Sequence, residues 1–173
     1  GHARILETGT LRALGVNPYD YFSRTTVQEQ VGILSVFKRP EMLTRSWGDV
    51  LVFNRLQDAS ADMQLDEIAG CFFGPLCDDI HEIEQEEKGH VEHGERSLKE
   101  YAQTPRGAFE VSRAFEFWLP EVLKVFGKPD AESRSMPLYL KYGIKKRTND
   151  ESRAHFLESI RPFFGSLGIY VLL

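Results

Sequence analysis

Two long helical segments follow each other in this chain with only a short break between them. Residues 46–73 carry apolar side chains close to the 3.6-residue period of an α-helix, and residues 76–102 form a second, much more polar run. Gly74-Pro75 separates the two segments, because this pair interrupts a helix and proline suits the first turn of the next one. The pattern predicts an all-α protein.

Most of the remaining chain also reads as helix, in residues 1–14, 104–126 and 148–165. The last of these opens on a capping box, in which Thr148 is followed by Glu151 three residues on. Residues 17–44 give a mixed pattern. We expect one domain over residues 1–173, in which residues 103–173 form a C-terminal helical extension packed on a bundle.

Composition places the chain among ordinary soluble proteins and excludes several functions. It has 173 residues, of which 42% are hydrophobic and 27% charged. A net charge of -5 with no basic block argues against nucleic acid as a partner. No apolar run approaches the ~20 residues of a membrane span, so we expect no membrane contact. Cys71 and Cys77 have no metal-finger spacing; we expect buried apolar thiols in a reducing cytoplasm.

A carboxylate and an imidazole lie one helical turn apart in the second long segment. Glu87 and His90 are three residues apart, so both project from one face of a helix. Oxygen and imidazole ligands suit iron, manganese or zinc, and two Glu-x-x-His faces that meet across a four-helix bundle form a di-iron site. A solvated acidic face is the alternative interpretation. The many carboxylates of this segment favour the metal site.

A further candidate ligand comes from the preceding helix. Asp58, Asp62 and Asp66 follow one another at four-residue steps on one face. Small side chains follow Asp58 in Ala59-Ser60-Ala61 and let another helix approach, so we predict that Asp58 points inward to the metal. Asp62 is the second choice for this ligand, and a surface acid is the alternative.

His2 stands at the start of the chain. The 88 positions from His2 to His90 leave room for one full helix and halves of two others, as a duplicated bundle requires. Residues 3–11 read as the interior of a helix, with no capping residue before them. We therefore expect the first bundle helix, and the Glu that pairs with His2, to lie upstream, so that this chain by itself is inactive and retains iron weakly. The alternative is that Gly1-His2 is a tag remnant.

Several other residues invite an interpretation. We expect Trp47 and Trp118 in the core or at an interface. His81, His93 and His155 share no ligand pattern, and we expect a surface position for His93. The basic run 145–147 suits either a phosphate-bearing ligand or a solvated loop.

Four stretches and the first two residues form a combined pattern. The stretches are Ser46-Trp47-Gly48-Asp49, Gly74-Pro75 with Glu87 and His90 at fixed offsets, Phe117-Trp118-Leu119-Pro120 with Phe126-Gly127, and Ile144-Lys145-Lys146-Arg147-Thr148-Asn149-Asp150-Glu151. In this pattern the chain resembles, from residue 1 to about residue 169, the iron-bearing catalytic subunits of bacterial phenylacetyl-CoA epoxidases, the ring-epoxidising monooxygenases of phenylacetate degradation. Gly1-His2 falls where that family ends its first Glu-x-x-Gly-His.

The resemblance implies a ferritin-like helical bundle with a six-ligand di-iron site. By position, His2, Asp58, Glu87 and His90 match four of the ligands, and the other two would lie upstream of residue 1. The resemblance further implies that two iron ions use O2 to epoxidise the aromatic ring of phenylacetyl-CoA, a CoA-thioester substrate. The implied partners are a flavin and iron-sulfur reductase, which supplies electrons from NADPH, and a ferritin-like sister subunit, within a cytoplasmic oligomer.

Two other functions stay open. The chain could be a non-catalytic ferritin-like structural subunit that binds a partner and no iron, or a general ferritin-like protein that handles iron or peroxide. Intact ligand pairs on two helices favour the monooxygenase over the structural subunit. The helices beyond the bundle favour it over a simple ferritin, which ends with its bundle helices.

Overall fold

The computed structural model describes residues 2–17, 36, 39, 42 and 45–171, and every regular element in them is a helix. The predicted all-α class is therefore confirmed for this part of the chain. The elements are α1 (His2–Leu6), the π-helical η1 (Glu7–Leu11), α3 (Trp47–Ile68), α4 (Gly74–Tyr101), α5 (Pro105–Val122), the 3-10 helices η4 (Leu123–Phe126) and η5 (Asp130–Glu132), α6 (Met136–Lys141) and α7 (Asn149–Ser166).

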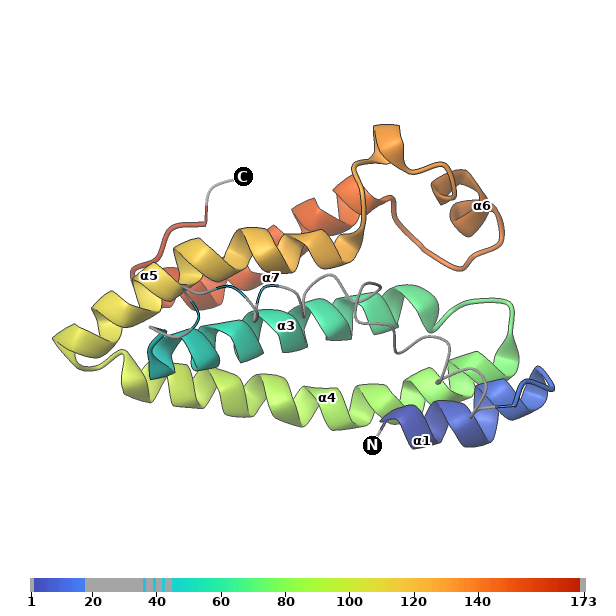
Figure 1. Cartoon of the computed structure of the whole chain (residues 1–173), viewed down its shortest axis with the longest axis horizontal. Helices are drawn as coiled ribbons and strands as arrows, with labels where there is room; N and C mark the ends of the chain where they lie inside the picture. The colour runs from blue at the N-terminus through green and yellow to red at the C-terminus, as the bar shows by residue number, and fades with distance from the viewer. Residues whose placement is uncertain (1, 18–35, 37–38, 40–41, 43–44, 172–173) are drawn as a thin grey trace.

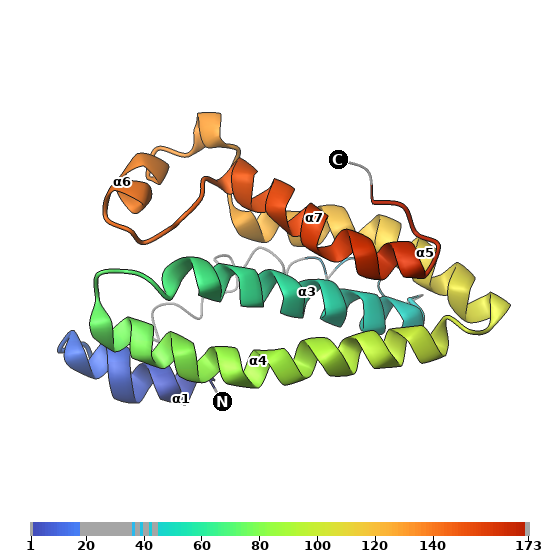
Figure 2. The ribbon, with the colours of Figure 1, turned by 180° about the vertical axis from the view of Figure 1, so that it is seen from behind.

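The helices form a bundle around α3. α3 lies between α4 on one side and α5 and α7 on the other (Figure 1), and the same arrangement is seen from behind (Figure 2). α1 and η1 lie along the first half of α4, while α6 stands away from the bundle at the end where α3 turns into α4. The described part of the chain contains no helix that is long and apolar enough to span a membrane.

Local signals set the ends of the two long helices. Asp49 accepts a hydrogen bond from the backbone N–H of Ser46 at 2.9 Å and closes the first turn of α3. Pro75 lies in the first turn of α4, as predicted. α3 ends at Ile68 rather than at Phe73, since the chain reverses there and Phe73 becomes the residue that precedes α4. The mixed segment 17–44 lies almost wholly outside the described residues.

Aromatic side chains from α3, α5 and α7 meet in the core. Trp118 is 1% exposed, and its ring centroid lies 4.6 Å from that of Phe53 on α3. Phe115 of α5 contacts Phe164 of α7 with centroids 4.4 Å apart. Such ring pairs add specific contacts to the burial of apolar area, which is the main stabilising contribution. Trp118 therefore occupies the core, as expected.

One carboxylate is enclosed completely between α3 and the start of α7. Glu67 is 0% exposed. Its Oε1 accepts a hydrogen bond from Ser152 Oγ at 2.9 Å and pairs with Arg147 Nη1 at 3.3 Å. A buried charge is tolerated only when it is paired and hydrogen-bonded, so these contacts determine how the end of α3 lies against α7.

We predict that Glu67→Ala lowers the free energy of unfolding by roughly 3 kcal/mol, because it leaves Ser152 and Arg147 without their shared acceptor. The matched control is Asp66→Ala, which removes an exposed carboxylate that pairs with Lys146 at the surface and should cost about 1 kcal/mol or less. Urea unfolding followed by circular dichroism measures both. Equal losses for the two variants would contradict the role given to Glu67.

Candidate metal centre

α3 and α4 are antiparallel neighbours whose register can be read from two contacts. Arg55 Nη2 of α3 donates to Glu95 Oε1 of α4 at 2.7 Å. A Cβ placed on Gly94 would lie 3.8 Å from the Cα of Arg55, so the two backbones approach closely there. Asp58 lies three residues after Arg55 in α3, and His90 lies four residues before Gly94 in α4. Because the helices are antiparallel, Asp58 and His90 lie at nearly the same height along the helix pair.

Asp58 and His90 line one pocket of about 790 Å³ between these two helices. Asp58 is partly buried and His90 is exposed. Trp47, Leu51 and Asn54 of α3 line the same pocket, and so do His93 and Tyr101 of α4. The structure therefore brings together two of the four predicted ligands, one carboxylate and one imidazole from different helices.

The packing of α1 and η1 on α4 has a register as well. Asp79 Oδ2 accepts hydrogen bonds from the backbone N–H and the hydroxyl of Thr10, each at 2.6 Å. The two segments run in opposite directions (Figure 1). Eight residues before Thr10 is His2, and eight residues after Asp79 is Glu87, so the backbones of these two residues lie at a similar level along the pair.

The four predicted ligands thus come from three neighbouring helices and from similar levels. The structure describes the backbones of His2 and Glu87 but not their side chains. Among the side chains that are described, no three of His, Cys, Asp or Glu lie together closely enough to bind a metal ion. The other two acids of the Asp58 face differ in position: Asp62 is partly buried, and Asp66 is exposed and pairs with Lys146 at 2.9 Å.

A polar network at one end of this pocket was not predicted. Tyr101 donates to Glu110 Oε2 at 2.5 Å, and Arg106 Nε donates to Glu110 Oε1 at 2.8 Å. The hydrogen bond from Tyr101, and then that from Arg106, lower the pKa of Glu110 from 4.5 to about 2. The network ties the end of α4 to the start of α5. The spacing of Arg106 and Glu110, one helical turn apart, could have predicted the contact between these two residues, but not the hydrogen bond from Tyr101.

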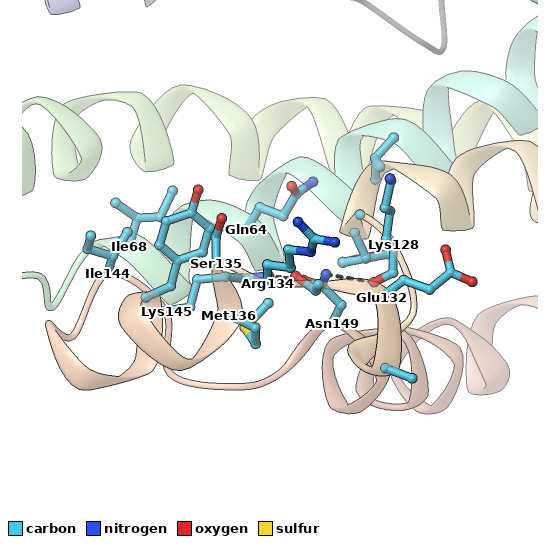
Figure 3. Close-up of a pocket in the computed structure, with 16 residues that line it drawn as sticks. Gln64, Ile68, Lys128, Glu132, Arg134, Ser135, Met136, Ile144, Lys145 and Asn149 are labelled. Atoms are coloured by element: carbon cyan, nitrogen blue, oxygen red, sulfur yellow. Dashed lines mark hydrogen bonds between the residues drawn. The ribbon is translucent and has the colours of Figure 1, made fainter.

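A second pocket, of about 940 Å³, lies between the end of α3 and the α6 region (Figure 3). Its lining combines apolar residues such as Ile68 and Met136 with the cations Lys128, Arg134 and Lys145. Of the basic run 145–147, only Lys145 lines this pocket, where its Nζ donates to Asn149 at 3.0 Å. Lys146 and Arg147 pair instead with Asp66 and Glu67.

The remaining predicted residues divide between surface and pocket. His81, His93 and His155 are all exposed, which confirms the surface position of His93. Trp47 is 61% exposed at the pocket edge, so it lies outside the core, and an interface stays the expectation for it. The expected burial of both thiols is wrong: Cys71 and Cys77 are partly exposed, because they lie where the chain reverses between α3 and α4.

The fold and this pocket define a class of protein: an all-α bundle in which a carboxylate and an imidazole from adjacent helices line the same pocket. Comparison with known proteins identifies the family. The profile of the family described as "Phenylacetic acid catabolic protein" matches residues 1–171. The chain belongs to this family, and the resemblance seen in its sequence is confirmed.

One curated relative agrees with this assignment. Over 139 residues the chain is 30% identical to a subunit of the 1,2-phenylacetyl-CoA epoxidase of Escherichia coli (strain K12). The aligned region covers 79% of this chain and 44% of that protein, so the chain spans less than half the length of this relative.

The lowered pKa of Glu110 predicts how the fold responds to acid. Ionised Glu110 stabilises the fold above its ordinary pKa of 4.5, and this contribution is lost as the pH falls towards about 2. Tyr101→Phe removes the largest cause of the lowering, so the stability lost on acidification should be smaller and should be complete at a higher pH. Urea unfolding at a series of acidic pH values measures it, with Tyr142→Phe, an exposed tyrosine of the α6 region, as the control. Identical pH profiles for the two variants would rule out the proposed coupling.

Proposed function

We propose that this chain contributes iron ligands to the catalytic subunit of a phenylacetyl-CoA epoxidase, a multicomponent monooxygenase that adds one oxygen atom of O2 to the aromatic ring of its substrate. The observation that carries the proposal is the shared pocket of Asp58 and His90, with Glu87 one turn before His90. The family and the E. coli relative support the placement in phenylacetate breakdown.

The donor chemistry fits iron. Asp58 offers carboxylate oxygen and His90 offers imidazole nitrogen, the ligand types found where di-iron sites occur in helical bundles. Asp58, Glu87, His90 and His2 are the residues of this chain that would bind the two ions. When bound, iron supplies the activation of O2 and the transfer of oxygen to the ring.

The other residues of this pocket would bind the substrate and hold the pocket wall in place. The pocket volume of about 790 Å³ is within the usual range for small-molecule sites. Trp47 and Leu51 offer apolar surface beside the polar Asn54, so an aromatic ring can pack there while the carboxylate and imidazole stay on one side. Tyr101, held by Glu110, keeps the far end of α4 against α5 and so keeps the pocket wall in place.

The remaining components belong to the same proposal. The substrate is a CoA thioester, and electrons reach the iron from NADPH through a flavin and iron-sulfur reductase. A ferritin-like sister subunit completes an oligomer in the cytoplasm. The E. coli relative is itself one subunit of its epoxidase, which supports an enzyme made of several chains.

A non-catalytic ferritin-like subunit is the second candidate. The two candidates differ in iron content.

We predict that the full-length protein containing this chain binds about two iron ions per polypeptide. Asp58→Asn should reduce this content by about half or more, because it removes an anionic ligand that offsets the cation charge. Asp62→Asn, one turn away on the same helix, is the matched control and should retain the iron. Metal analysis of the purified proteins measures the content.

The alternatives give different results when metal analysis is combined with an assay of ring epoxidation. Loss of iron in Asp62→Asn but not in Asp58→Asn would show that Asp62, one turn further along α3, is the ligand, and would leave the proposal of an iron site intact. An iron-free parent protein that supports epoxidation only beside another, iron-bearing subunit would establish the non-catalytic role. Iron without ring epoxidation in the presence of the reductase would favour a general iron-handling protein.

A further inference from the structure

Two thiols face each other at the reversal between α3 and α4. The Sγ atoms of Cys71 and Cys77 lie 3.4 Å apart. These are the two cysteines of the chain, so each thiol has one possible partner for an intramolecular disulfide. None of the functions discussed above uses them.

Hydrogen bonds orient the pair. The Cys77 thiol donates to the backbone carbonyl of Cys71 at 3.1 Å, and the Cys71 thiol contacts the carbonyl of Phe73 at 3.7 Å. Both side chains are partly exposed, so a small solute can reach the sulfur atoms. Cys77 lies in the first turn of α4, whereas Cys71 lies in the turn that precedes it.

We propose that Cys71 and Cys77 are an oxidation site, at which a two-electron oxidant such as hydrogen peroxide converts the two thiols into an intramolecular disulfide. One thiol sulfur attacks peroxide, becomes a sulfenic acid and releases water. The second sulfur then attacks the first: the S–S bond forms, the S–O bond breaks and a second water leaves. The two thiols lose two protons and two electrons, which together make two hydrogen atoms, and one peroxide is reduced to two waters.

The movement that the reaction needs is small. The sulfur atoms must close from 3.4 Å to a bonded separation of about 2.05 Å. Cys71 lies outside the helices, and its backbone N–H donates one turn hydrogen bond, to the carbonyl of Ile68 at 2.9 Å, so a small shift of its side chain breaks no run of helical hydrogen bonds. Partial burial, and then the neighbouring Cys71, raise the pKa of the Cys77 thiol. Since the thiolate is the attacking form, the reaction runs faster at alkaline than at neutral pH.

The disulfide would tie the end of α3 to the start of α4. These are the helices that carry Asp58 and His90, so oxidation would restrict their connection without touching the pocket itself. The inference rests on the thiol contact and is independent of whether the protein binds iron.

The test uses the reduced chain, treated with hydrogen peroxide at mildly alkaline pH. Remaining thiols are then alkylated with N-ethylmaleimide in denaturant, and the intact mass is measured. We expect a monomer that has lost two hydrogen atoms and takes up no alkylating reagent, and the digested protein should yield residues 71 and 77 in one linked peptide. Thiols that stay reactive, oxygen atoms added to the two cysteines in place of the link, or dimers linked between chains would each overturn the proposal.

Single-residue variants make the test specific. Cys71→Ser and Cys77→Ser each leave one thiol, and neither should give the intramolecular product. The oxidised parent should also unfold at a higher temperature than the reduced parent, whereas peroxide should give the two variants no such increase. An increase of the same size in the variants would show that another oxidation, such as that of methionine, is responsible.

Discussion

The enclosure of α3 is the constraint on which the rest of the structure depends. With α4 on one side and α5 and α7 on the other, the buried polar side chains of α3 must find partners inside the protein. Arg55 pairs with Glu95 of α4, and Glu67 accepts from Ser152 of α7. Because an unpaired buried charge is costly, each pair permits only a narrow range of helix positions, and together they set the register of the helices around the pocket.

This register explains why ligand candidates far apart in the chain come together. Arg55 and Gly94 bring α3 and α4 into close contact, and Asp58 and His90 follow one turn away. The bond between Thr10 and Asp79 sets the register of α1 and η1 against α4. The proposed metal centre is therefore a consequence of helix pairing by groups that are not themselves ligands. The thiol contact at the reversal of the chain arises from the same pairing of α3 with α4.

Some predictions from the sequence were wrong for an identifiable reason. Cysteine is usually a buried residue, but Cys71 and Cys77 lie in a reversal that the pattern of residues 46–73 did not show. For Trp47 the sequence left the core and an interface open, and this residue opens α3 at a pocket edge. Residue type carried the prediction in each case, whereas the packing of neighbouring helices decided the outcome.

The sequence by itself determined the features that depend on neighbours along the chain. These include the long helices, the break at Gly74-Pro75, the capping box of Thr148 and Glu151, and the one-turn spacing of Glu87 and His90. Only the tertiary structure decided that Asp58 lines a pocket while Asp66 pairs with Lys146, and that the two thiols touch. The physical reason is that periodicity and capping act within a few residues, whereas the rotation and register of a helix are set by contacts with residues far away in the chain, 80 positions in the case of Asp66 and Lys146.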